Sequence, residues 1–204
     1  TRFMTPSLLC AMNELSNHDH SRFLTRTNHK VGRVNNLGSA AAGENVNKGV
    51  LKEAVVIQMT WPGAPTIYYG DEAGVVGFTD PDNRRTYPWG QEDQELLAFH
   101  RDIIRIHREN EALRTGSLKI LGGEHQVMCY GRFNRRQQFI VVVNNDYVER
   151  FMEWRVWPAE MERETRLERL IMTRPETYSL DSEIYEVHDG RLKINLPPNT
   201  AVIL

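Results

Sequence analysis

The sequence is poor in cysteine, has no long apolar run and carries no excess of charge. Its 204 residues include only two cysteines, Cys10 and Cys129. Two thiols cannot make a multi-disulfide scaffold, and they favour a reducing compartment such as the cytoplasm. The 25 Lys and Arg nearly balance the 27 Asp and Glu, which argues against a nucleic-acid-binding surface. No apolar run approaches the roughly 20 residues that span a bilayer, so a membrane is not an expected partner either.

What remains is the composition of an ordinary globular protein. Hydrophobic residues make up 40% of the chain and charged residues 25%. A chain of this length holds one or two domains with real cores, because domains typically have on the order of 150 residues. The longest uninterrupted apolar runs, such as residues 139–143, have the length of a strand.

Residues 1–115 alternate between strand-like and helix-like patterns. We predict buried strands at residues 8–15 and 66–69, and helices at residues 45–60 and 92–113, where apolar side chains recur at three- and four-residue steps. This alternation is typical of a parallel sheet covered by helices. Only two such β/α units are present, and two strands cannot bury both faces of a sheet, so this part resembles a slice of a larger fold.

Residues 116–204 change to a period of two. Several short strands at regular spacing predict a small antiparallel β-sandwich. The charged residues 160–169 are expected to form a solvated excursion. The strands are predicted at residues 126–133, 138–144, 148–157, 192–196 and 201–204.

A polar turn with an aspartate and two histidines follows the first predicted strand. Asp19 and His18 lie side by side in sequence, and such a pair could stabilise a developing cation and hold a hydroxyl group. The alternative is a purely structural turn, since Asn, His and Asp all favour turns. A metal site on His18 and His20 is disfavoured, because alternate residues of an extended segment point to opposite faces and no third ligand is near. We expect no metal and no cofactor.

Polar residues also follow the second predicted strand. Asp71 and Glu72 come directly after it and are expected to be structural residues at the same rim. Further along, Asp80 and Arg84 are four residues apart on a loop and could clamp sugar hydroxyls. The alternative for this loop is a set of local surface ion pairs.

Three motifs in order resemble the α-amylase superfamily of barrel glycosidases. Residues 12–23, MNELSNHDHSRF, resemble its strand-seven motif, and residues 63–74, GAPTIYYGDEAG, its strand-eight motif. Residues 80–84, DPDNR, resemble the following loop of neopullulanases, cyclomaltodextrinases and maltogenic amylases. The resemblance implies the last two β/α units of a TIM-type barrel at residues 1–115 and a C-terminal antiparallel β-sandwich at residues 116–204.

The resemblance also implies roles for five residues. Asp19 matches the catalytic carboxylate that stabilises the transition state, and His18 matches a histidine that hydrogen-bonds the same sugar. Asp80 and Arg84 match substrate-binding residues of the neopullulanase branch, and Arg22 is a further candidate behind them. The implied substrate is an oligosaccharide or polysaccharide α-glucan. A fixed carboxylate suits this chemistry, because the oxocarbenium-like transition state is cationic.

The sequence lacks the other two carboxylates that such an enzyme requires. A retaining glycosidase needs a nucleophile and an acid/base about 5 Å apart. Gly32-Arg33 and Gly131-Arg132 are not followed by the residues of the nucleophile motif. A whole barrel also takes about 250 residues. We therefore expect the C-terminal portion of an amylase-type enzyme, inactive by itself and self-associating through exposed barrel edges.

Two other functions remain open from the sequence. A glycosyl-transferring or isomerising relative would use the same site with a sugar in place of water. A non-catalytic carbohydrate-binding module would be built on residues 116–204, with Trp154 or Trp157 as a sugar platform. These two tryptophans are three apart in a predicted strand and so are expected on opposite faces. Packing in the core is the competing use for either ring.

Overall fold

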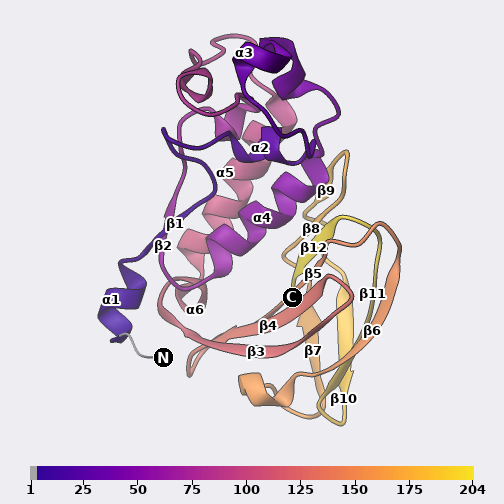
Figure 1. The fold of residues 1–204 in the computed structure, drawn as a ribbon. Helices are drawn as coiled ribbons and strands as arrows, with labels where there is room; N and C mark the ends of the chain where they lie inside the picture. The colour runs from indigo at the N-terminus through magenta and orange to yellow at the C-terminus, as the bar shows by residue number, and fades with distance from the viewer. Residues whose placement is uncertain (1–3) are drawn as a thin grey trace.

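The computed structural model describes residues 4–204 and has a helical part beside two antiparallel sheets (Figure 1). The first three residues of the stretch predicted as barrel units, residues 1–3, lie outside the described residues. The helical part contains α4 (Lys48–Thr60) and α5 (Gln94–Glu109), which cross the molecule next to the sheets. Within residues 4–204, no helix is both long enough and apolar enough to cross a membrane.

The strand predicted at residues 8–15 is mostly wrong. Thr5–Leu9 form the helix α1, with Pro6 in its first turn, where a proline is tolerated. Only Met12–Glu14 form a strand, β1, and its side chains are exposed or half-buried. The second strand, β2, covers Ala64–Thr66 and so lies two residues before the predicted start. The first error arises because short apolar runs fit a helix and a strand equally well. The second is a shift of the strand boundary, since residues 67–69 lie outside any helix or strand.

The two predicted long helices are present and have defined ends. The side chain of Asn47 accepts a hydrogen bond from the amide of Val50 at 3.1 Å and begins α4. Asp93 does the same for Leu96 at 3.1 Å and begins α5. The predicted helix 92–113 is two helices, because α5 ends at Glu109 and a short α6 (Glu111–Thr115) follows. Shorter helical segments complete this part: α2 (Phe23–Arg26), α3 (Val34–Leu37) and 3-10 turns at Ser39–Gly43, Asp71–Ala73 and Asp82–Arg84.

The remaining strands form two antiparallel sheets. The six-stranded sheet has the order β3 (Ser117–Glu124), β4 (Val127–Phe133), β5 (Gln138–Asn144), β12 (Thr200–Ile203), β8 (Ile171–Thr173) and β9 (Tyr178–Ser179). The four-stranded sheet has the order β6 (Arg150–Arg155), β11 (Arg191–Leu196), β10 (Ile184–His188) and β7 (Thr165–Glu168). The antiparallel sheets predicted after residue 115 are therefore confirmed.

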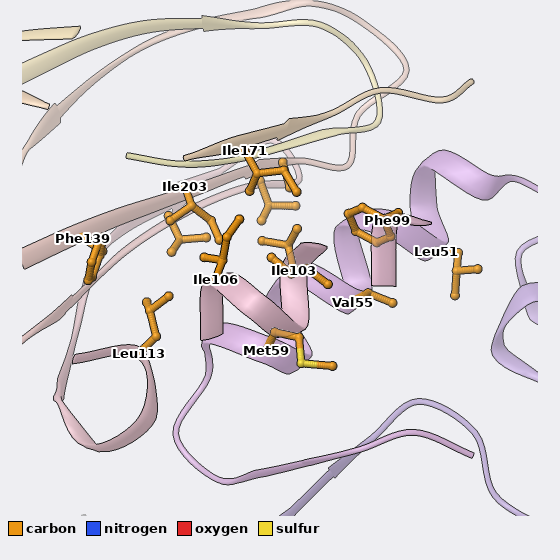
Figure 2. Packing of buried hydrophobic residues seen from close by; sticks show 14 of the residues in the cluster. Leu51, Val55, Met59, Phe99, Ile103, Ile106, Leu113, Phe139, Ile171 and Ile203 are labelled. Atoms are coloured by element: carbon orange, nitrogen blue, oxygen red, sulfur yellow. The ribbon is translucent and has the colours of Figure 1, made fainter. Parts of the chain in front are cut away.

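The six-stranded sheet is a middle layer, covered on both faces. Along β5, Phe139, Val141 and Val143 pack with α4, α5 and α6, while Ile140 and Val142 pack against the four-stranded sheet. This is why residues 139–143 are an unbroken apolar run rather than an alternating one. Figure 2 shows the helix-side core, to which α4, α5 and the sheet all contribute.

One buried arginine joins the two parts at this core. Arg132 on β4 is fully buried, and its guanidinium donates to the backbone carbonyls of Thr60, Gly116 and Ser117. Burial lowers the pKa of Arg132 to about 10, so the side chain keeps its charge at neutral pH. The helical part and the sheets thus share both an apolar core and a polar link.

Two details of the sheets differ from the sequence predictions. Residues 160–169 are not simply a solvated excursion, because Thr165–Glu168 form β7 and Leu167 is buried between the sheets. Trp157 does not share a strand with Trp154, since β6 ends at Arg155 and Trp157 begins a 3-10 turn. Trp154 is buried in the core, whereas Trp157 is 50% exposed.

Candidate functional site

The site is built where the two short parallel strands end. β1 and β2 pair in parallel, with Met12 opposite Ala64 and Glu14 opposite Thr66. Their carboxyl ends therefore lie at one edge, and the polar segments that follow them start side by side. This is the placement that the sequence predicted for the rim.

The amide groups of two side chains hold this strand pair on α4. Asn13 donates to the carbonyl of Trp61 at 3.1 Å, and Gln58 donates to Asn13 and Thr66 carbonyls at 3.0 and 2.8 Å. Gly63 allows the close approach: a Cβ there would lie 2.7 Å from the carbonyl oxygen of Ala11, and its φ is +144°. The rim is therefore fixed to the helix that packs beneath it.

Asp19 and His18 are presented to solvent by a hydrogen-bonded turn. The Asn17 side-chain oxygen accepts from the amides of Asp19 and His20 at 2.9 and 3.1 Å, and its amide group donates to Glu14 at 2.7 Å. The His18 Nε2 and Asp19 Oδ1 atoms are 3.4 Å apart, with side chains 64% and 66% exposed. An open carboxylate beside an imidazole can bind sugar hydroxyls and stabilise positive charge.

Asn83 connects this turn to the loop that carries Asp80 and Arg84. It is fully buried, and its Nδ2 donates to the carbonyls of Asn17 and His20 at 3.2 and 2.7 Å. Asn83 belongs to the DPDNR motif, but the motif alone predicts no role for it. Its neighbours carry the visible charges, and nothing in the local sequence signals that it points inward.

Arg22 is enclosed beneath the two loops. Its side chain has no exposed surface, its Nε donates to the Asn83 carbonyl at 2.8 Å, and its Nη1 donates to Asp71 at 3.0 Å. The guanidinium also lies 4.0 Å from the centre of the Tyr68 ring. Arg22 was a substrate-binding candidate, but the structure gives it no surface from which to touch a substrate. It holds Asn83 and Asp71 in place instead.

Asp71 and Glu72 occupy structural positions at the rim. Asp71 is buried against Arg22. Desolvation raises the pKa of its carboxyl, and hydrogen bonding to Ser16 and Arg22, together with the charge of Arg22, opposes that shift. Glu72 accepts a hydrogen bond from the amide of Gly70 at 2.9 Å and so closes the turn after β2. Neither carboxylate is left open in the way that Asp19 is.

Asp80 and Arg84 form an ion pair at the surface of the second loop. The Arg84 Nε and Asp80 Oδ1 atoms are 2.6 Å apart, and the two side chains are each about half exposed. Arg85 fixes the loop from behind by donating to both carboxylate oxygens of Asp82. Among residues 4–204, no hydrogen bond or ion pair joins Asp19 to Asp80 or Arg84; the two loops meet through Asn83.

The described residues offer no cluster suited to a metal ion. Within residues 4–204, no group of three or more His, Cys, Asp or Glu side chains is arranged to hold one. His18 contacts Asp19, and the backbone carbonyl of His20 accepts from Asn83.

Comparison with known proteins identifies the family. The family described as alpha amylase, catalytic domain, matches residues 5–121, which is more than half of the chain. The chain belongs to the alpha-amylase family. It is 43% identical over 131 residues to an amylopullulanase of Thermoanaerobacter thermohydrosulfuricus, with 64% of this chain covered, and 31% identical over 198 residues to neopullulanase 2 of Thermoactinomyces vulgaris, with 94% covered.

The chain spans only a small part of these alpha-amylase relatives. It covers 9% of the amylopullulanase and 28% of the neopullulanase. Among solved structures, a cyclomaltodextrinase superposes with a TM-score of 0.70 at 27% identity, covering 95% of this chain and 29% of that one. The similarity to solved structures therefore extends over the helical part and the sheets together.

Proposed function

We propose that this chain is the C-terminal portion of a retaining glycoside hydrolase that cleaves α-glucosidic bonds of maltodextrin-like saccharides. In this proposal β1 with α4 and β2 with α5 are the last two β/α units of a barrel, within residues 1–115. Residues 116–204 are the C-terminal sandwich. Family membership and the names of the relatives support this substrate class.

The Asp19–His18 pair is the observation that carries the proposal. Among the acids at the rim, Asp71 is buried on Arg22 and Glu72 closes a backbone turn, while Asp19 remains open beside an imidazole. We assign Asp19 to stabilising the cationic transition state and His18 to binding a hydroxyl of the cleaved sugar. Asp80 and Arg84 bind a neighbouring sugar, and Arg22 positions the loops.

The nucleophile and the general acid come from residues outside this chain. Two carboxylates about 5 Å apart are required for retention, and one open aspartate does not supply them. We therefore expect the isolated chain to be inactive. Water or a second sugar can accept the glycosyl group at the same site, so a transferring or isomerising activity uses the same assignment.

The stereochemistry of the product tests the proposal. The complete protein that contains this sequence is incubated with maltotriose, and the first product anomer is followed by proton NMR. The α-anomer is expected first, because retention requires two inversions at the anomeric carbon. Initial release of the β-anomer, or no cleavage of any α-glucan, would overturn the proposal.

We also expect the isolated chain to self-associate, because apolar surface is exposed on the helical part. A groove of about 290 Å³ runs along α4 and β1, lined by side chains that include Leu15, Ala54, Ile57 and Trp61. Unpaired strand edges and apolar surface favour association. Size-exclusion chromatography with light scattering should give a mass that rises with concentration; a constant monomer mass would contradict this.

The alternative function, a non-catalytic carbohydrate-binding module, is supported by the exposure of one tryptophan. Trp157 is half exposed, and its ring packs on Gly190, where a Cβ would lie 2.9 Å from it. Trp154 is buried and cannot serve as a platform. Loss of maltooligosaccharide binding in Trp157→Ala would support this alternative over a catalytic part.

A further inference from the structure

One side of α4 is an open groove that runs from β1 toward the six-stranded sheet. Two adjoining hollows of about 290 and 310 Å³ form it, and they share the side chains of Leu15, Ala54 and Ile57. We name the two hollows together the α4 groove. Most of its lining side chains are apolar, and neither hollow is lined by a lysine or an arginine.

The apolar side chains that α4 contributes to this groove form one stripe. They are spaced four, three and four residues apart, which places them on one face of a helix. The stripe consists of Val50, Ala54, Ile57 and, at the C-cap, Trp61. Another face of α4 is packed in the core with α5 and the six-stranded sheet (Figure 2). A stripe of this kind is a surface on which a second helix packs, and the small side chain of Ala54 lets the two axes approach closely.

A buried carboxyl group lies among these apolar side chains. Glu53 lines the groove and is 3% exposed, and its Oε1 has no hydrogen-bond partner among residues 4–204. Lys52, the adjacent lysine on α4, is paired with Glu95 at 2.9 Å. Removing a carboxyl group from water is costly unless a donor or a cation faces it. Glu53 therefore calls for a partner that the described residues do not supply.

The strand beside the α4 groove has an open edge. In the part of the chain that the structure describes, β1 pairs with β2 alone, so its second edge has no neighbouring strand. In a β/α barrel, strands lie side by side in chain order and their helices form an outer ring in the same order. A preceding β/α unit whose strand paired with this edge would lay its helix against the side of α4 that carries the groove.

We propose that Glu53 forms a buried ion pair with an arginine or lysine on a helix that fills the α4 groove, and that this helix belongs to the part of the complete protein that precedes this sequence. The inference rests on the proposed function, in which this chain is the C-terminal portion of a longer enzyme. An ion pair inside an apolar groove fixes the register of the helix, because only one position along the groove brings the cation to Glu53. A second copy of this chain fits less well, since it would bring another Glu53 and no cation from the same groove.

The sign of one substitution in two proteins tests the ion pair. Glu53→Gln is made in the 204-residue chain and in the complete protein that contains this sequence, and melting temperatures are measured by scanning calorimetry at pH 8. The 204-residue chain should melt about 2 °C higher or more, because an amide carries no charge to bury. The complete protein should melt about 1 °C lower or more, because the cation loses its partner in a buried groove. Glu162→Gln, which changes an exposed carboxylate, is the matched control and should shift neither protein.

Ala54→Phe tests separately whether the groove is filled. The added ring enters open space in the 204-residue chain but collides with a packed helix in the complete protein, so only the complete protein should melt at a lower temperature.

Three results would overturn the inference: a higher or unchanged melting temperature of the complete protein with Glu53→Gln, an unchanged one with Ala54→Phe, or shifts that disappear when a dimer of the complete protein is diluted to monomers. The last result would assign the groove to a second copy. The proposed function is tested apart from these results by the product anomer. A complete protein that cleaves no α-glucan but shows the change of sign with Glu53→Gln would refute the activity and leave the ion pair standing.

Discussion

The helical part and the sheet part differ in how their strands are covered. The two antiparallel sheets bury one face on each other, and the six-stranded sheet buries its second face on helices. β1 and β2 form a parallel pair of three residues each, with side chains exposed or half-buried. Parallel sheets are normally covered on both faces. The six-stranded sheet is thus covered on both faces, whereas the parallel pair β1–β2 is not covered within residues 4–204.

The two parts nevertheless share one core. The substitution with the largest expected loss of stability tests whether they unfold together. Phe99 on α5 is fully buried between the helices and the six-stranded sheet (Figure 2). Phe99→Ala should lower the free energy of unfolding by about 3–5 kcal/mol. Urea denaturation followed by fluorescence and by circular dichroism should shift as one transition. Two separate transitions, only one of them moved by Phe99→Ala, would show that the parts fold independently.

Breaking the polar link between the two parts should cause the second-largest loss of stability. Arg132→Met leaves the carbonyls of Thr60, Gly116 and Ser117 without their donors. We expect a loss of about 2–4 kcal/mol in the free energy of unfolding, because hydrogen bonds to charged groups are strong and the Thr60 carbonyl remains buried. The exposed neighbour Arg135→Met is the matched control and should stay within about 0.5 kcal/mol.

A buried acid on α4 makes stability depend on pH. Glu53 is 3% exposed, and burial raises the pKa of its carboxyl to about 9 from an ordinary value of 4.5. The folded state thus binds the proton more tightly, so the stabilising contribution is full below pH 4.5 and is lost as pH rises toward 9. Glu53→Gln should remove this slope and stabilise the protein by roughly 1–3 kcal/mol at pH 8.

Glu53 also adjoins the uncovered side of the helical part. It lines a groove with Leu15, Ala54 and Ile57, and among residues 4–204 its Oε1 has no hydrogen-bond partner. Thermal unfolding of wild type and Glu53→Gln from pH 4 to pH 9 measures the slope. Parallel profiles for the two proteins would contradict the assignment of this pH dependence to Glu53.

The smallest predicted effect concerns the two loops of the candidate site. Asn83→Ala removes both hydrogen bonds to the turn of Asn17 and His20 and should cost about 1–2 kcal/mol. Amide hydrogen exchange should quicken at residues 17–20 and 80–85 while the sheets stay protected. The exposed Asn36→Ala should leave exchange unchanged. Unchanged exchange in Asn83→Ala would mean that other contacts join the loops.

The sequence predicted long elements well and short ones poorly, for reasons visible in particular residues. The repeat of Leu96, Phe99 and Ile103 located α5 because one helix face packs into one core. β7 was missed because charged residues surround Leu167, the one buried position of that strand. The strand at residues 8–15 failed because its apolar run is shared between α1 and β1.

The candidate site shows the same limit. Asp19, His18, Asp80 and Arg84 were found by motif, and all four are exposed in the structure. The inward side chains of Arg22 and Asn83 could not be assigned from sequence, since their partners, mostly backbone carbonyls, are 47 to 66 residues away in the chain. Contacts at such separation leave no local pattern to read.

The turnover of one variant tests the central claim most directly. Asp19→Asn is made in the complete protein that contains this sequence, with Glu72→Gln as a control, since a glutamine oxygen can still accept from Gly70. Asp19→Asn should lower kcat on maltotriose by about 100- to 1,000-fold with little change in fold, because a charge that stabilises the transition state is lost. A kcat within about threefold of wild type would contradict the assignment of Asp19 as a catalytic residue.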